Sequence, residues 1–103
     1  MIITTTAQIS GRNLETLSLV RGSIVQSKNI GRDFMAGMKT IVGGEIKSYT
    51  DMLNEAREIA IGRMVAEAQS LGADAIVEMR FASSSVMQGA AEIIAYGTAV
   101  KFK

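Results

Sequence analysis

Arginine and glutamate side chains spaced one helical turn apart are the residues of this sequence best suited to chemistry. Arg63 and Glu67 are four residues apart in a run of good helix formers, and Arg57 precedes them in the same run. That spacing puts Arg63 and Glu67 on one side of a helix, next to its apolar stripe. Because a guanidinium offers fixed donors to carboxylate or phosphate, the pattern predicts a small-anion site or a buried ion pair, and we favour the ion pair.

Two methionines are the remaining candidates for a metal site. Met35 and Met38 are three residues apart in a segment of helical periodicity, so both thioethers would face one point, where Cu(I) could bind. The chain has no Cys and no His, and its carboxylates are scattered along the sequence. Since methionine commonly fills gaps in packed interfaces, we expect Met35 and Met38 to serve packing, and we expect no metal and no cofactor.

Composition excludes several other classes of function. Without Cys or His, the 103-residue chain cannot form a disulfide framework, a zinc finger or a Ser-His-Asp triad. Its 11 basic and 10 acidic residues give none of the basic excess that nucleic-acid binding needs. No spacing pairs a nucleophile with a base, so an enzyme is not the expected class. The length indicates a single domain over residues 1–103.

Residue patterns predict the strands that must position these side chains. The predicted strands cover residues 2–9 at a sheet edge, 14–27, 74–82 and 92–102. Arg21-Gly22 interrupts the alternation of the long strand 14–27, which predicts a bulge there. In 74–82 the odd-numbered residues from Ala75 to Phe81 are expected on one face, and a turn over 83–89 makes an antiparallel hairpin with the last strand.

Helical periodicity predicts two helices between the strands. A short one covers 29–42 and is stopped by Gly43-Gly44, and a long one covers 49–71. Ser48 and Asp51 have the spacing of a capping box at the start of the long helix, and Gly72 follows its end.

The apolar arc of the long helix is wider than packing on one sheet requires. Ile61, Val65 and Ala68 lie to one side of the main stripe, and we expect them to contact a neighbouring subunit. The chain is also apolar for its size, since its Ala, Val, Ile, Leu, Met, Phe and Gly residues make up about 55% of it against about 45–50% in soluble domains, which favours burial against further copies of itself. No apolar run is long enough to span a membrane, and the opening residues lack the basic start and apolar core typical of a signal peptide, so we expect a cytoplasmic protein without membrane or nucleic-acid partners.

Several segments together resemble the YbjQ family of small bacterial proteins, which carry a heavy-metal-binding label. The most specific is AREIAIGRMVAEAQSLGADAIVEMRF, residues 56–81. The family's other blocks follow in order: VRGSIV at 20–25, IGRDFMAGMKTIVGG at 30–44, SYTDML at 48–53 and AYGTAVKF at 95–102. The resemblance therefore covers nearly the whole chain.

The resemblance implies an α+β fold, a two-layer dodecin-like β-α-β-β subunit whose long helix packs on a small antiparallel sheet. It also implies a pentameric ring, in which short extra strands join the subunits. Our leading hypothesis is a homo-oligomeric scaffold or small-ligand-binding module. The alternatives are a heavy-metal-binding protein and an enzyme acting on a small anionic substrate at the subunit interface.

Overall fold

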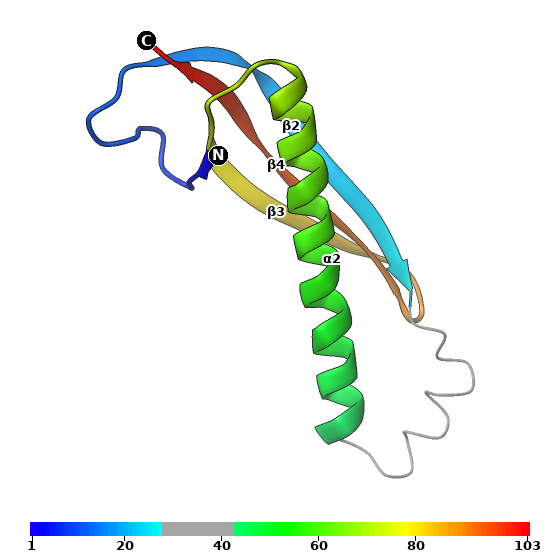
Figure 1. The fold of residues 1–103 in the computed structure, drawn as a ribbon. Helices are drawn as coiled ribbons and strands as arrows, with labels where there is room; N and C mark the ends of the chain where they lie inside the picture. The colour runs from blue at the N-terminus through cyan, green and yellow to red at the C-terminus, as the bar shows by residue number, and fades with distance from the viewer. Residues whose placement is uncertain (28–42) are drawn as a thin grey trace.

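The computed structural model describes residues 1–27 and 43–103, with side chains described from Lys47 onward in the second range. The short helix predicted over 29–42, including Met35 and Met38, lies outside the described residues. Four strands and one long helix make up the described part: β1 (Ile2–Ile3), β2 (Leu14–Ser27), α2 (Gly43–Ser70), β3 (Ala75–Met87) and β4 (Ala90–Phe102). The fold is α+β, with α2 packed on a four-stranded mixed sheet (Figure 1).

The sheet has the strand order β1-β3-β4-β2, and it confirms the predicted hairpin. β3 and β4 pair antiparallel, as do β4 and β2, whereas the two-residue β1 pairs parallel with the start of β3. The predicted strand over 14–27 is β2 itself. The hairpin strands are longer than predicted because Ser83, Ser84 and Ser85 continue β3, which leaves only Gln88-Gly89 for the turn.

Gly22 does not mark a bulge, contrary to the sequence prediction. The β2–β4 register runs without interruption from Ser18 to Ser27, and its irregularity lies between Thr16 and Ser18. Gly22 instead lies where α2 crosses β2, and a Cβ atom there would collide with the Ala60 carbonyl oxygen and the Met64 amide nitrogen. The missing side chain thus allows close approach of helix and strand.

The helix-facing core is built from small residues of α2. Ala56, Ala60, Met64 and Ala68 recur every fourth position, are fully buried, and pack against residues of all three long strands. The helix begins at Gly43, so the predicted start near Ser48 is wrong, whereas the end of the predicted short helix lies outside the described residues. Its end agrees with the prediction, since Gly72 has a φ of 76°, typical of a glycine that ends a helix.

A bulge in β3 changes the facing pattern predicted for 74–82. Val77 pairs with Thr98 and Arg80 with Tyr96, so Glu78 and Met79 together oppose the single residue Gly97. Ile76 and Met79 therefore both join the core under α2. Ala75 and Val77 belong to a second cluster on the opposite side of the sheet, which we call the outer face. Strict alternation fails because the bulge shifts side-chain direction by one residue.

The N-terminal segment covers part of this outer face. Ile9 packs with Leu14 and Phe102 against the second cluster of buried residues. The segment before Ile9 also extends the sheet, because the Glu78 and Met79 amides donate to the Thr6 and Thr4 carbonyls, each at 3.0 Å. We call this part of the molecule, where both termini lie, the terminal end (Figure 1).

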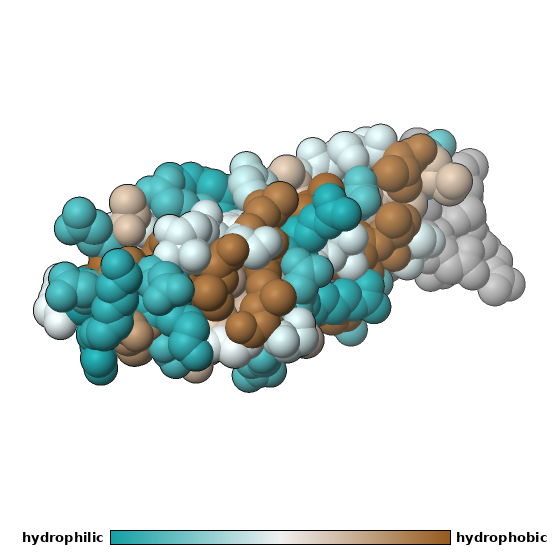
Figure 2. Space-filling view, turned by 90° about the horizontal axis from the view of Figure 1, so that it is seen from above, coloured by the Kyte–Doolittle hydropathy of each residue, from teal (hydrophilic) through white to brown (hydrophobic). Residues whose placement is uncertain are grey.

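The opposite end of the sheet, formed by Arg80–Met87 of β3 and Ala90–Ala95 of β4, is called the hairpin end. α2 packs mainly on β2 and much less on β3, and its N-terminal half diverges from the strands (Figure 1). The radius of gyration is 17.2 Å, against about 13 Å for a compact domain of about 100 residues. The elongated body leaves apolar side chains exposed, and Figure 2 shows them along the middle of one face and toward the hairpin end.

Candidate functional site

Arg57, one of the predicted site residues, lies in a groove between the N-terminal half of α2 and the hairpin end. The groove has a volume of about 340 Å³. The helix side contributes Tyr49, Leu53 and Arg57, and the strand side is formed by Ser83–Ser85, Met87 and Gly89–Ala91 together with Ile93. The groove exists because α2 covers β2 and β4 but leaves the helix-facing side of β3 open.

The Arg57 guanidinium provides the positive charge in this groove. Its Nη1 donates to Oδ1 of Asn54 at 2.8 Å, which holds the side chain along the helix. Among residues 1–27 and 47–103, no carboxylate lies within 4.0 Å of the guanidinium. Arg57 is half-buried, so its remaining N–H groups can donate to an anion that enters the groove.

Hydroxyl groups line the strand side of the groove. Ser83 pairs with Ile93 and Ser85 pairs with Ala91 in the β3–β4 register. Since Ile93 belongs to the core under α2, Ser83 and Ser85 share its helix-facing side. With Tyr49 and Arg57 opposite, the groove combines one cation and several hydroxyls with the apolar side chains of its lining, which suits a small anion.

Arg63 and Glu67 lie outside this groove and bind β2. Arg63 Nη1 donates to the Ser23 carbonyl at 2.6 Å, and Glu67 Oε1 accepts from the Arg21 amide at 3.0 Å. Both side chains belong to exposed residues, and within the described residues they form no ion pair with one another. The predicted buried ion pair is replaced by bonds to backbone groups, because β2 is an edge strand whose outward amides and carbonyls need partners.

The three residues predicted to contact a neighbouring subunit differ in their surroundings. Ala68 is completely buried in the core of the chain itself, so it has no surface left for a neighbour. Ile61 and Val65 are half-buried and pack at the margin of that core. The helical-wheel argument misplaced Ala68 because the α2 core stripe follows every fourth residue from Ala56 onward.

The described part of the chain contains no cluster of three or more His, Cys, Asp or Glu residues placed to hold a metal ion. The weak candidates Met35 and Met38 are outside that part. The described helix also has no stretch long and apolar enough to cross a membrane.

Sequence reasoning missed the residues that face Arg57 across the groove. Ser83 and Ser85 were assigned to a turn, because polar residues next to a glycine usually indicate one. Only the register of the extended hairpin brings them to the same side as Ile93. Tyr49 was placed only at the start of the predicted long helix, since no spacing links it to residues more than 30 positions later.

The described part of the chain thus has the fold of a small α+β protein, in which one long helix packs on a four-stranded sheet and leaves a groove open beside it. A family model described as "Putative heavy-metal-binding", the YbjQ model, matches residues 1–103. The UPF0145 protein of Clostridium novyi is 63% identical over 101 residues, covering 98% of each chain. The UPF0145 protein of Alkaliphilus metalliredigens is 62% identical over 102 residues, covering 99% of each. The chain therefore belongs to the YbjQ family, also named UPF0145.

A solved structure supports the fold. A protein of unknown function from Pediococcus pentosaceus, placed in the DUF74 family, superposes with a TM-score of 0.71 at 17% sequence identity. The match covers 100% of this chain and 98% of the other. At this identity the likeness bears on the fold alone.

Proposed function

We propose that the protein is a cytoplasmic homo-oligomeric module, assembled as a pentameric ring, which holds a small anionic ligand in the groove beside Arg57. The observation that carries the proposal is the exposure of large apolar side chains along β2 and in the β3–β4 hairpin. Leu19, Val25 and Met87 are 63%, 57% and 67% exposed. Such side chains mark interaction surfaces when they gather in one region, and a second copy of the chain is the commonest partner.

The outer face along β2, from Leu19 toward the hairpin end, has the features of a self-association surface. Leu19 and Val25 alternate along β2 with core residues, so they lie on the outer face. Tyr96 on β4 adds a further apolar side chain, at 38% exposure, and is flanked across the strands by Arg21 and Arg80. The N-terminal segment packs on the outer face around Val77 and Val100, and it contacts this part at Arg80, whose Nη1 donates to the Thr5 carbonyl.

The groove supplies the binding part of the proposal. Its single described cation, Arg57, has no carboxylate partner within the described residues, whereas the other groove groups are neutral. An anion with a short apolar part would satisfy both the guanidinium and the apolar side chains of Leu53 and Met87.

The assembly part is tested by a charge on the outer face. Leu19→Glu and Val25→Glu should each reduce the particle mass, measured by light scattering after size exclusion, because a carboxylate cannot be buried there without a partner. Ser10→Glu, an exposed position at the terminal end, is the matched control and should leave the mass unchanged. Wild-type protein that migrates as an 11.0 kDa chain at micromolar concentration would remove this part of the proposal.

The binding part is tested by calorimetric titration with hexanoate and with inorganic phosphate. We expect Arg57→Gln to weaken binding of either anion at least tenfold, which is about 1.4 kcal/mol. Lys101→Gln removes the same charge from β4, outside the residues that line the groove, and should bind like the wild type. Equal binding by wild type and Arg57→Gln would show that the groove is not the site.

A further inference from the structure

Glu78 has a backbone conformation that L-residues seldom adopt. Its φ is 56°, and it is the single non-glycine residue with positive φ among those described. Glu78 and Met79 form the β3 bulge opposite Gly97, and the Glu78 amide is fixed by its bond to the Thr6 carbonyl at 3.0 Å. A glycine would adopt this conformation without strain. This backbone conformation is less favourable for glutamate than for glycine. What glutamate adds at this position is its carboxylate.

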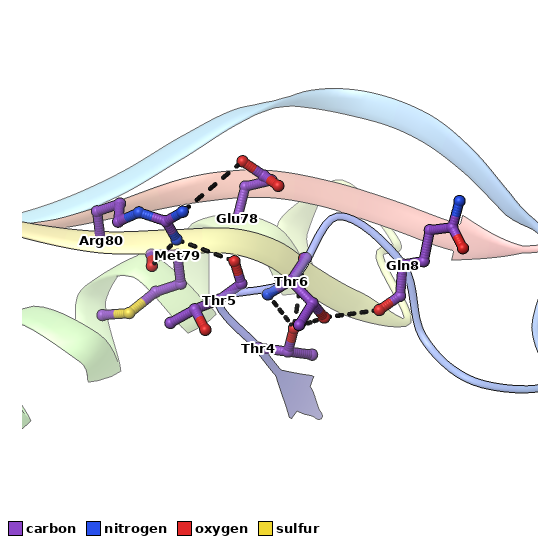
Figure 3. A network of polar contacts seen from close by, with 7 residues as sticks. All are labelled: Thr4, Thr5, Thr6, Gln8, Glu78, Met79 and Arg80. Carbon is purple, nitrogen blue, oxygen red and sulfur yellow. Dashed lines mark hydrogen bonds and ion pairs between the residues drawn. The ribbon is translucent and has the colours of Figure 1, made fainter.

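The local contacts of Glu78 do not account for this strained glutamate. Its Oε2 lies 4.0 Å from Nη2 of Arg80, and both side chains are 50% exposed, so the pair contributes little in water. Arg80 is already held without it, because Nη1 donates to the Thr5 carbonyl at 3.0 Å and to the Met79 carbonyl at 2.9 Å (Figure 3). The carboxylate has no hydrogen bond within the described residues beyond this long ion pair.

Glu78 also lines the larger of the two cavities described, which is distinct from the groove beside Arg57. This cavity lies between the N-terminal segment and the outer face of the sheet, and its volume is about 490 Å³. Polar groups from three parts of the chain surround it: Gln8, Arg12, Asn13, Thr16, Glu78 and Thr98. Val77 and Val100, both buried in the outer-face cluster, provide an apolar base.

Arg12 brings a positive charge to the same cavity. Its guanidinium carbon lies over the Phe102 ring, 4.3 Å from the ring centre, which is a cation–π contact that favours this position of the guanidinium. N–H groups at the edge of a stacked guanidinium remain free to bind a carboxylate in two-pronged fashion. Within the described residues, Arg12 and Glu78 do not form an ion pair with each other. The cavity thus presents a separate cation and anion.

We propose that this cavity binds a free α-amino acid, with the ligand ammonium at Glu78 and the ligand carboxylate at Arg12. A zwitterion matches two opposite charges that line one cavity without neutralising one another. The amides of Gln8 and Asn13 and the hydroxyls of Thr16 and Thr98 are available to polar groups on the ligand side chain. The inference is independent of the groove and of the assembly, because it concerns other residues.

The test uses the full chain and a panel of L-alanine, L-leucine, L-glutamine and L-lysine. Binding is followed by amide chemical shifts of Val77, Glu78 and Thr98. Propionate lacks the ammonium of alanine and ethylamine lacks the carboxylate, so both should bind at least tenfold more weakly than the best amino acid. Shifts from either fragment equal to those from the amino acids would overturn the proposal, as would the absence of shifts with all four.

Variants of Glu78 separate a binding role from a structural one. Glu78→Gly should raise the melting temperature, because it removes the backbone strain, and should weaken amino-acid binding at least tenfold. Glu78→Gln keeps the strain and should lose binding without that rise. Arg12→Gln should also lose binding, whereas Glu92→Gln, on the outer face beyond the cavity, should not. A Glu78→Gly variant that melts lower than the wild type, or that binds equally well, would contradict the assignment.

Discussion

The two ends of one sheet are closed in different ways. At the terminal end the N-terminal segment lies over the outer face, where Ile9, Leu14 and Phe102 pack on a small cluster of buried residues. At the hairpin end no described segment covers the outer face, and apolar side chains such as Val25 and Met87 are more than half exposed. The chain thus covers part of its outer face itself at the terminal end, whereas at the hairpin end a cover would have to come from the partner copy that we propose.

The same comparison applies to the polar groups of the sheet edges. Along β2 the outward backbone groups of Arg21 and Ser23 are occupied by Glu67 and Arg63 of α2. Along β3, Thr4 and Thr6 pair with the strand only as far as Met79, and no described residue occupies the edge beyond Arg80. Edge strands attract further strands unless they are covered, so the uncovered edge is again at the hairpin end.

The largest predicted effect on stability is at the point where α2 crosses β2, between the terminal end and the hairpin end. Gly22→Val should destabilise the fold by about 3 kcal/mol or more, because its side chain would meet helix backbone rather than movable side-chain atoms. The midpoint of urea unfolding measures this effect. Gly62→Ala is the control, since a Cβ there has no neighbour within 4 Å, and it should stabilise the helix by about 1 kcal/mol. Equal urea-unfolding midpoints for Gly22→Val and the wild type would contradict the close contact between α2 and β2 at Gly22.

Two methionines sharpen the contrast between core and hairpin end. Met64 is fully buried under α2, so Met64→Ala should cost about 3 kcal/mol of unfolding free energy. Met87 is 67% exposed, so Met87→Ala should change the stability of a single chain by less than about 0.5 kcal/mol. If the hairpin end is covered by a partner, Met87→Ala weakens association instead, which a dilution series monitored by light scattering detects. If Met87→Ala instead lowered the stability of the chain strongly and left association intact, the hairpin end would not be an association surface.

A smaller effect is expected where α2 protects the β2 edge. Arg63→Ala and Glu67→Ala should each cost about 1 kcal/mol, since each removes a charged partner of an exposed backbone group. Glu67→Gln keeps an acceptor and should recover most of the loss. Glu58→Ala, an exposed glutamate of the same helix, serves as the control and should be nearly neutral. Denaturation midpoints that match for Glu67→Ala and Glu58→Ala would mean that the Arg21 amide gains nothing from Glu67.

The elements of this fold follow from local patterns, whereas their positions relative to one another do not. The bounds of β2 and the glycine at the end of α2 were predictable, because strand propensity and helix-stop signals act over a few residues. The start of α2 was missed, since Gly43-Gly44 is a stop signal that the longer helix overrides. Expectations about assembly remain predictions.

The candidate site was only partly predictable, for a physical reason. The sequence suggested Arg57, Arg63 and Glu67 for either a small-anion site or a buried ion pair, and the ion pair was favoured. Ser83 and Ser85, the groove partners of Arg57, come from β3 and are brought near by strand register, which no local pattern encodes. The strained Glu78 was likewise hidden, because a bulge breaks the alternation that sequence reasoning assumes.

Hydrogen exchange at both ends of the same sheet tests the central claim most directly. Peptides covering the terminal end and peptides covering residues 80–94 are compared in protein of known particle mass, from high micromolar to nanomolar concentration. The account predicts a multiple of the 11.0 kDa chain at high concentration, with protection of residues 80–94 that falls on dilution while the terminal end is unchanged. A single chain at every concentration, with residues 80–94 constantly protected, would contradict it.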